Sequence, residues 1–225
     1  DEITRLSDSI VCMRDGEVVE TWDSGDVPKE AIVRAMVGRD FTYGHSEPPA
    51  HSGEVVLEVR GLARRSAFKD MNFEVSKGEI LGVAGLVGAG RTEMVRTIAG
   101  ADAATEGEIL LEGKRISCKH PESTITAGIA MVPEDRKNQG LNLSLTAQHN
   151  IVLPWEKVIA KRGIVTKRWM EKTAKEQADF LDIRGRTDIE VRYFSDGNQQ
   201  KVLRGKWLVR QPKVLILDEP TRGVD

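Results

Sequence analysis

The residues best suited to chemistry are the consecutive positions Gly85 to Thr92, which read Gly-Leu-Val-Gly-Ala-Gly-Arg-Thr. Their spacing fits the phosphate-binding pattern G-x-x-x-x-G-K-[ST], except that Arg91 stands where the pattern has Lys. Glycines let consecutive backbone N–H groups curl around an anion, and the positive end of a following helix points at the same place. Thr92 can offer its hydroxyl to a Mg²⁺ ion that bridges phosphates. We therefore predict a phosphate site; a glycine-rich turn that binds nothing is the alternative.

Two adjacent carboxylates, Asp218 and Glu219, follow the apolar run Val214-Leu215-Ile216-Leu217. Holding two acids at the end of an apolar strand is costly unless they meet a cation or water. Asp218 suits the coordination of Mg²⁺, and Glu219 suits the polarisation of an attacking water. Since Pro220 follows, a pair of acids in a surface turn is the alternative.

A third segment, from Phe194 to Lys201, reads Phe-Ser-Asp-Gly-Asn-Gln-Gln-Lys. Serine is a favoured N-cap because its hydroxyl accepts a hydrogen bond from an N–H group of the first helical turn. By itself this segment predicts a helix that begins at Ser195, with Gly197 in its first turn.

Short apolar runs that alternate with helical patterns must position these residues. We expect helices over about 92–99 and over most of 144–181. The run Ile80 to Ala84 is expected to be a buried strand that leads into the phosphate loop. The other expected strands are 55–59, 71–75, 108–112 paired with 115–116, 129–132 and 213–217. Buried strands that alternate with helices favour an α/β domain with a parallel sheet.

The first part of the chain has a different pattern. Residues 9–21 predict a β-hairpin with an Asp-Gly turn, and a short helix is expected between Asp26, as its cap, and Gly38. Residues 41–53 are rich in His, Ser, Glu, Pro and Gly and have no apolar periodicity, so they predict a linker.

Composition excludes several classes of protein. The chain has 225 residues with 33 Lys and Arg against 35 Asp and Glu, a net charge of −2, which excludes a strongly basic nucleic-acid binder. The basic stretch between Lys157 and Lys175 is expected to be a solvated helical face rather than a nucleic-acid patch. No apolar run approaches the roughly 20 residues that span a bilayer. Cys12 and Cys118 match no metal or redox spacing.

Together the three chemical segments are far more specific than any one of them. Their order, a phosphate loop, then Ser-x-Gly-x-Gln, then Asp-Glu-Pro-Thr, resembles the ATP-binding-cassette (ABC) ATPases. In finer detail the chain resembles the second cassette of the double-cassette ATPases that power the import of ribose, galactose, xylose and related sugars. The motifs that carry this resemblance are Gly-Leu-Val-Gly-Ala-Gly-Arg-Thr-Glu, Val-Pro-Glu-Asp-Arg-Lys, Asn-Gln-Gln-Lys-Val and Asp-Glu-Pro-Thr-Arg-Gly-Val-Asp.

The resemblance divides the chain into three parts. Residues 1–40 resemble the C-terminal tail of that family's first cassette, 41–53 are the linker, and 54–225 resemble a second cassette that stops after its D-loop. We therefore expect the chain to be a window on a longer polypeptide.

The fold implied by the resemblance is α/β: a P-loop NTPase with a RecA-like parallel sheet core, an antiparallel β subdomain and a helical signature subdomain. The implied cofactors are ATP and Mg²⁺. The implied partners are membrane-spanning permease subunits, a periplasmic or extracellular sugar-binding protein reached through the complex, and another cassette, intramolecular or in a homodimer. The implied location is the cytoplasmic face of the cell membrane, with no nucleic-acid partner.

The family's functional residues carry over position by position. Thr92 and Asp218 match the Mg²⁺ ligands, Glu219 matches the general base, and Glu134 occupies the place of the glutamine that senses the metal and the γ-phosphate. Asp225 matches the D-loop aspartate. The expected nucleotide-binding residues are Gly85, Leu86, Val87, Gly88, Ala89, Gly90, Arg91, Thr92 and Glu93. The expected signature residues, which contact ATP held by the other cassette, are Ser195, Asp196, Gly197 and Gln199.

Three departures from the family pattern suggest altered activity. Arg91 replaces a compact ammonium with a planar guanidinium, and Glu134 places a negative charge near phosphate oxygens. We hypothesise that this site binds nucleotide but hydrolyses it slowly or not at all. Asp196 replaces a glycine, and its charge would repel the partner's γ-phosphate, so Asp196→Gly is expected to raise the ATPase activity of the transporter.

Two alternatives stay open at this point. One is a regulatory cassette that closes on ATP without hydrolysing it. The other is an ABC ATPase that acts on nucleic acid, although none of the long insertions usual in that group interrupts residues 92–218. The adenine-stacking residue is also open, because no aromatic precedes the phosphate loop at the usual place. Arg64 or Arg65 could stack on the base by its guanidinium plane, but solvation of both is favoured.

Overall fold

A computed structural model describes most of the chain, in two compact units, Asp1–Pro49 and Ala50–Asp225. Asp26, Gly38, nearly all of the linker and Asp225 lie outside the described residues, so the predictions for them stay untested. The described residues are 2–14, 16–23, 27–37, 53–155 and 166–220.

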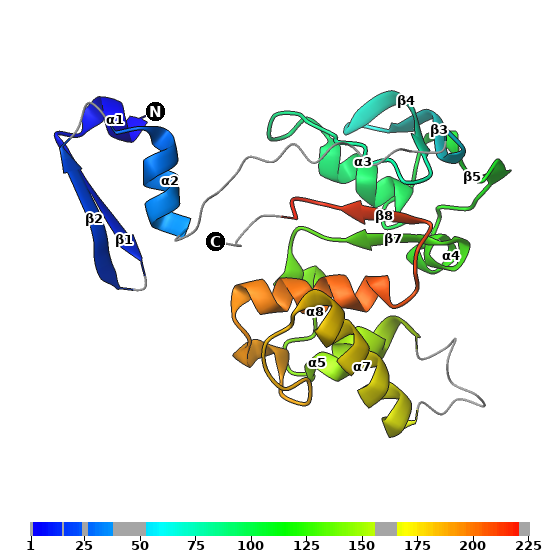
Figure 1. Ribbon diagram of the computed structural model, residues 1–225. Coiled ribbons are helices and arrows are strands. Elements are labelled where there is room, and N and C mark those ends of the chain that lie inside the picture. Colours follow the sequence, from blue (N-terminus) through cyan, green and yellow to red (C-terminus); the bar gives the residue numbers. More distant parts are fainter. Residues whose placement is uncertain (1, 15, 24–26, 38–52, 156–165, 221–225) are drawn as a thin grey trace. The chain divides into compact units, whose positions relative to one another are not determined.

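The first unit contains two short helices and one hairpin (Figure 1). Helix α1 (Glu2–Leu6) precedes strands β1 (Ser9–Arg14) and β2 (Glu17–Asp23), which pair antiparallel, and helix α2 (Lys29–Val37) follows. Gly16, in the turn, has a φ of +85°, a conformation that glycine adopts without steric cost. The predicted hairpin and the helix after it are confirmed.

An antiparallel sheet begins the second unit. Its strand order is β4-β3-β5-β6, with every neighbour antiparallel. The strands are β3 (Val55–Arg64), β4 (Phe68–Ser76), β5 (Glu106–Leu111) and β6 (Lys114–Arg115). Leu57, Val59 and Ile109 are buried, and they pack with Met94 and Ile98 of helix α3 (Arg91–Ile98). The predicted antiparallel subdomain is confirmed, with longer strands than the apolar runs indicated.

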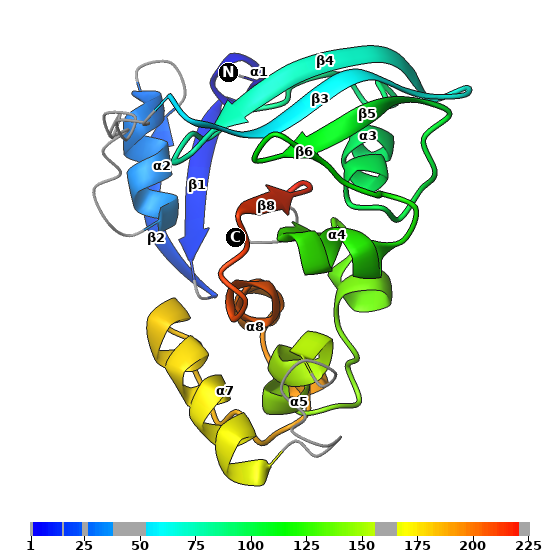
Figure 2. The ribbon, with the colours of Figure 1, turned by 90° about the vertical axis from the view of Figure 1, so that its right-hand side faces the viewer.

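A parallel pair, β7 (Ile129–Val132) and β8 (Val214–Leu217), joins this sheet region to a helical region. Successive side chains of a strand point to opposite faces. Ile129 accordingly packs in the cluster that contains α3, whereas Val132 and Leu215 pack in the cluster of the helices. Figure 1 shows the pair between α3 and α8, and Figure 2 shows β8 above α8 from another side.

The apolar segment Ile80 to Ala84 corrects one prediction. We expected a buried strand, but the structure assigns no strand there, and the Ile80 side chain is 85% exposed, with Leu81 and Val83 also exposed. An apolar run becomes a strand only when a neighbour supplies ladder hydrogen bonds. Among the described strands, β7 pairs with β8 alone, and neither forms a ladder with residues 80–84. Apolar composition predicted a tendency to be buried but not the pairing partner that burial requires.

The helical region confirms the expectation for residues 144–181 wherever the structure describes it. Its elements are α5 (Ala147–Val152), the 3₁₀ turn η2 (Leu153–Trp155), α7 (Lys167–Leu181), the 3₁₀ turn η3 (Val191–Tyr193) and α8 (Asp196–Leu208). Trp169, Ala174, Ala178 and Leu181 share the inner face of α7, as predicted. The outer face carries Lys–acid pairs spaced four residues apart, the solvated pattern expected there. Within the described residues, no helix is long and apolar enough to cross a bilayer.

Four elements were not predicted, among them α1 and η3. The other two flank β7: helix α4 (Pro121–Ala127) precedes it, and the five-residue π-helix η1 (Arg136–Gly140) follows it. Short π-helical turns are rare and occur often at functional sites.

Candidate functional site

The loop before α3 has the geometry of an anion site. Gly88 and Gly90 have φ values of +82° and +85°, and α3 begins immediately afterwards at Arg91. A Cβ atom on Gly90 would lie 2.7 Å from the Ala67 carbonyl oxygen, so both the backbone conformation and the space require glycine. Gly90 is also the N-cap, where no side chain caps the helix. The first-turn N–H groups can therefore be satisfied by a bound anion.

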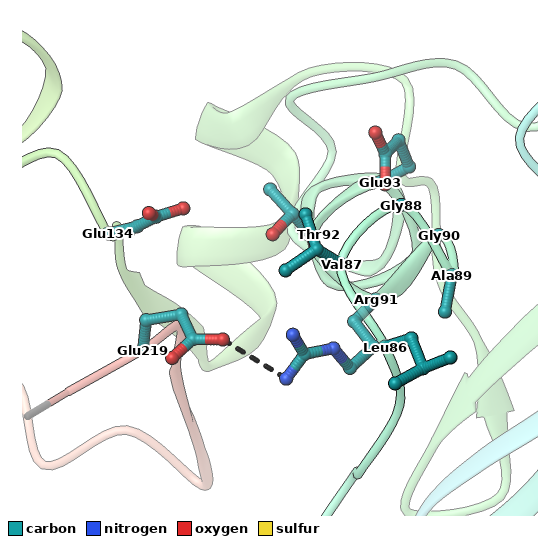
Figure 3. A pocket seen from close by; sticks show the side chains of 10 residues that line it. All are labelled: Leu86, Val87, Gly88, Ala89, Gly90, Arg91, Thr92, Glu93, Glu134 and Glu219. Carbon is teal, nitrogen blue, oxygen red and sulfur yellow. Dashed lines mark ion pairs between the residues drawn. The ribbon is translucent and has the colours of Figure 1, made fainter. Parts of the chain in front are cut away.

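A pocket of about 400 Å³ lies over this loop (Figure 3). It brings together the phosphate loop with one acid from the segment after β7 and one acid from the segment after β8. The phosphate loop, Glu134 and Glu219, which are far apart in sequence, therefore line one space. The lining residues are Leu86, Val87, Gly88, Ala89, Gly90, Arg91, Thr92, Glu93, Glu134 and Glu219.

Asp218 is buried and lies beside Thr92, a residue of this pocket. Its backbone N–H donates to the Val132 carbonyl at 3.0 Å, which extends the β7–β8 ladder, and Thr92 Oγ1 donates to its Oδ1 at 3.3 Å. Burial raises the pKa of Asp218 because the charged form loses hydration. A carboxylate and a hydroxyl oxygen at this separation suit a hard cation such as Mg²⁺, whose remaining ligands are usually phosphates and water. Among the described residues, no group of three or more His, Cys, Asp or Glu could hold a metal ion.

Arg91 and Glu219 face each other across the pocket, as the dashed line in Figure 3 marks. The Arg91 Nη1 to Glu219 Oε1 distance is 3.0 Å, and the two side chains are 31% and 40% exposed. Glu219 has a φ of +45°, which is uncommon for a residue with a side chain. The loop cation is thus engaged by the acid that was predicted to act as the base, and phosphate oxygens would compete with that acid for it.

Ser195 caps α8 as predicted, since its Oγ accepts from the Asn198 backbone N–H. The pocket's lining does not include the segment from Ser195 to Gln199. Ser195 and Asp196 are exposed, whereas Gln199 is buried and its Nε2 donates to the carbonyls of Val191 and Phe194. Gln199 therefore stabilises the turn before the helix instead of facing solvent.

The Asp196 carboxylate pairs with the Arg136 guanidinium and lies 3.8 Å from Lys137 Nζ. The hydrogen bond from Arg136 lowers the pKa of Asp196. The predicted effect of Asp196→Gly on activity stays a prediction, but the neighbouring guanidinium would offset part of the repulsion on which it was based. Sequence reasoning did not select Arg136; the only signal was the run Glu-Asp-Arg-Lys that begins at Glu134.

The arginines near the possible adenine site differ in environment. Arg64 Nη1 lies 3.0 Å from Asp102 Oδ2, and Asp102 also accepts two hydrogen bonds from Arg96. Arg65 is exposed. The Arg64 guanidinium is thus held by Asp102, which supports neither a stacked nor a fully solvated state.

Comparison with known proteins agrees with this geometry. Residues 68–222 match the family model described as ABC transporter. The ribose import ATP-binding protein RbsA 3 of Rubrobacter xylanophilus is 44% identical over 226 residues, which are 100% of this chain and 45% of that protein. The ribose import ATP-binding protein RbsA of Bacillus subtilis is 38% identical over 233 residues, 100% of this chain and 46% of that protein. The chain therefore spans about half the length of these relatives.

Solved structures show the same fold. The chain superposes on cbiO1 from Clostridium perfringens, part of the ABC transporter complex cbiONQ, with a TM-score of 0.62 at 24% identity, covering 76% of this chain and 68% of that one. It superposes on the ATP-binding cassette MJ0796 bound to ADP and Pi with a TM-score of 0.62 at 23% identity, covering 75% and 76%. The P-loop NTPase fold predicted from the motifs is confirmed.

Proposed function

Because the chain belongs to the ABC transporter family, we propose that it binds ATP with Mg²⁺ in the pocket over residues 85–92 and serves a monosaccharide importer as part of its ATPase. The observation that carries this proposal is the convergence of the phosphate loop, Glu134 and Glu219 on one pocket, with Thr92 in contact with Asp218. The sugar-import part rests on the printed names of the relatives, of which this chain spans about half.

Several residues in and beside the pocket have a proposed task. Backbone N–H groups of the loop and the Arg91 guanidinium bind phosphate oxygens. Thr92 and Asp218 hold Mg²⁺, which when bound neutralises phosphate charge. Glu219 orients and polarises the attacking water, and Glu134 lies where it can sense the phosphate end of the nucleotide.

The Arg91–Glu219 ion pair favours a second candidate function for this pocket. A base whose carboxylate is held by the loop cation is less available to a water molecule. The pair therefore supports the hypothesis of a cassette that binds ATP and hydrolyses it slowly, with a regulatory role in a larger ATPase.

The partners follow from the same proposal. The exposed turn at Ser195 and Asp196 would contact ATP held by another cassette. Asp225 would be the D-loop aspartate at the same interface between cassettes. Membrane-spanning permease subunits would bind at the cytoplasmic face of the membrane, and a sugar-binding protein would act through them. In the described part of the basic stretch, the lysines on the outer face of α7 pair with acids, which does not favour a nucleic-acid partner.

Titration of the chain with a fluorescent ATP analogue, displaced by ATP, tests the binding site. Thr92→Ala should weaken binding at least tenfold with Mg²⁺ and change it little in EDTA. Thr126→Ala, which changes an exposed threonine of α4, is the matched control. Equal affinity of Thr92→Ala and wild type with Mg²⁺ would contradict the site. Sugar import is tested by reconstituting the complete polypeptide with its permease in vesicles and measuring ATP-dependent uptake of ribose, galactose and xylose.

A further inference from the structure

The π-helix η1 is attached to α8 at both of its ends. At the start of η1, the Arg136 guanidinium pairs with the carboxylate of Asp196, which is the first residue of α8. At the end of η1, Lys206 Nζ, from the last turn of α8, donates to the Gly140 carbonyl at 2.7 Å. One polar contact near each end of α8 therefore holds η1 against that helix.

Close packing fills the space between these contacts. A Cβ atom on Gly140 would lie 2.9 Å from Leu203 Cδ2 and 3.0 Å from its Cδ1, and both residues are buried. A side chain at position 140 would force the buried Leu203 side chain to shift, so η1 and α8 are closely packed at this point. A displacement of η1 would move the start of α8 with it.

The same η1 is joined directly to the pocket. Glu134, which lines the pocket, precedes η1 by two residues, and Asp135 caps η1 by accepting from the backbone N–H groups of Lys137 and Asn138. Only a short, hydrogen-bonded piece of chain separates the phosphate end of the pocket from the residue that holds Asp196.

The two partners of the ion pair differ in exposure. The Arg136 side chain is 9% exposed and the Asp196 side chain 53%. A largely buried guanidinium needs a polar partner, and Asp196 supplies one. An acid in the first turn of a helix is also favourable without any cation, because of the helix dipole. The role of the pair must therefore be separated from the effect of the acid alone.

We propose that Arg136 is a positioning residue that acts through Asp196. By pairing with the first residue of α8, it sets the direction of the Ser195–Gly197 turn and thereby the contact of that turn with ATP on a second cassette. This inference rests on the proposed function. Charge repulsion predicts that loss of Asp196 raises turnover. The positioning role predicts the opposite, because loss of Asp196 releases the turn and lowers turnover.

The test uses the complete polypeptide assembled with its permease and measures kcat and KM for ATP. Asp196→Asn and Arg136→Gln should each lower kcat about tenfold, with KM and the thermal midpoint nearly unchanged. Asp196→Glu and Arg136→Lys keep the charge pair and should restore most of the turnover. Asp188→Asn, which removes an exposed acid paired with Arg186 outside the site, is the matched control.

The outcomes separate this inference from the proposed function. An unchanged or raised kcat for Asp196→Asn, with ATP still bound, overturns the positioning role and leaves the nucleotide site intact. Equal losses in Asp196→Asn and Asp196→Glu also overturn it, because the charge pair would then not matter. Failure of the wild-type chain to bind ATP overturns both proposals. If Arg136→Gln does not fold, Asp196→Asn against Asp196→Glu still decides the question.

Discussion

Removal of the Glu219 charge should strengthen nucleotide binding, because Glu219 and phosphate oxygens compete for Arg91. Two unit charges 3.0 Å apart attract by about 1.4 kcal/mol in water, but both side chains are about a third exposed. Surface ion pairs of this kind are worth about 0.2–1 kcal/mol after solvent screening and side-chain entropy are included. Relief of that competition in Glu219→Gln should therefore lower the Kd for ATP by up to about fivefold.

The assay is isothermal titration of the chain with ATP and Mg²⁺ at low salt and again at about 0.5 M salt. The gain should shrink at high salt, since screening weakens exposed pairs. Glu176→Gln, which removes an exposed acid from a Lys–Glu pair on α7, is the control and should change nothing. Unchanged or weaker binding by Glu219→Gln at low salt would refute the idea that Glu219 holds Arg91 away from the nucleotide.

Three further predictions concern the supports of the site. Gly90→Ala should destabilise the chain by about 1–3 kcal/mol in urea unfolding and abolish ATP binding, because a side chain at φ +85° would contact the Ala67 carbonyl. Asp102→Asn should lower the free energy of unfolding by about 1 kcal/mol at pH 7. The hydrogen bond from Arg96 lowers the pKa of Asp102, so its stabilising contribution is present above the ordinary pKa of an aspartate and is lost as the pH falls below about 4. Asp218→Asn should raise the thermal midpoint of the nucleotide-free chain at pH 7, because burial raises the pKa of Asp218 and the ionised carboxylate therefore costs stability. A lower midpoint would contradict this reasoning. If the ATP affinity of Asp218→Asn still responds to EDTA, Asp218 is not the Mg²⁺ ligand.

The pocket was predictable because its chemistry is local in sequence. The glycine spacing at 85–90 predicted a loop that leads into a helix, and the acids after an apolar run predicted the end of β8. Helix α4 escaped prediction because its sequence, Pro-Glu-Ser-Thr-Ile-Thr-Ala, is rich in β-branched residues of modest helix propensity. Tertiary contacts, including the hydrogen bond from Thr124 Oγ1 to the Ala99 carbonyl, stabilise it instead.

Contacts between distant residues were the part that no local pattern could show. Asp196 and Arg136 are separated by 60 positions, and nothing near either residue indicates the other. The segment from Ile80 to Ala84 fails for a related reason, since strand formation depends on a partner elsewhere in the chain. Local sequence therefore predicted which groups are present, and the structure was needed to show which of them are already paired.

The parallel pair β7–β8 has a consequence for how the second unit unfolds. Its side chains enter both hydrophobic clusters, so neither cluster can lose its packing without exposing one face of the same two strands. Because the two clusters share these strands, we expect them to unfold as one cooperative unit. Local opening of either cluster should then cost nearly the free energy of global unfolding. Asp218 follows directly after β8, so the carboxylate that would meet the cation is attached to strands that both clusters hold in place.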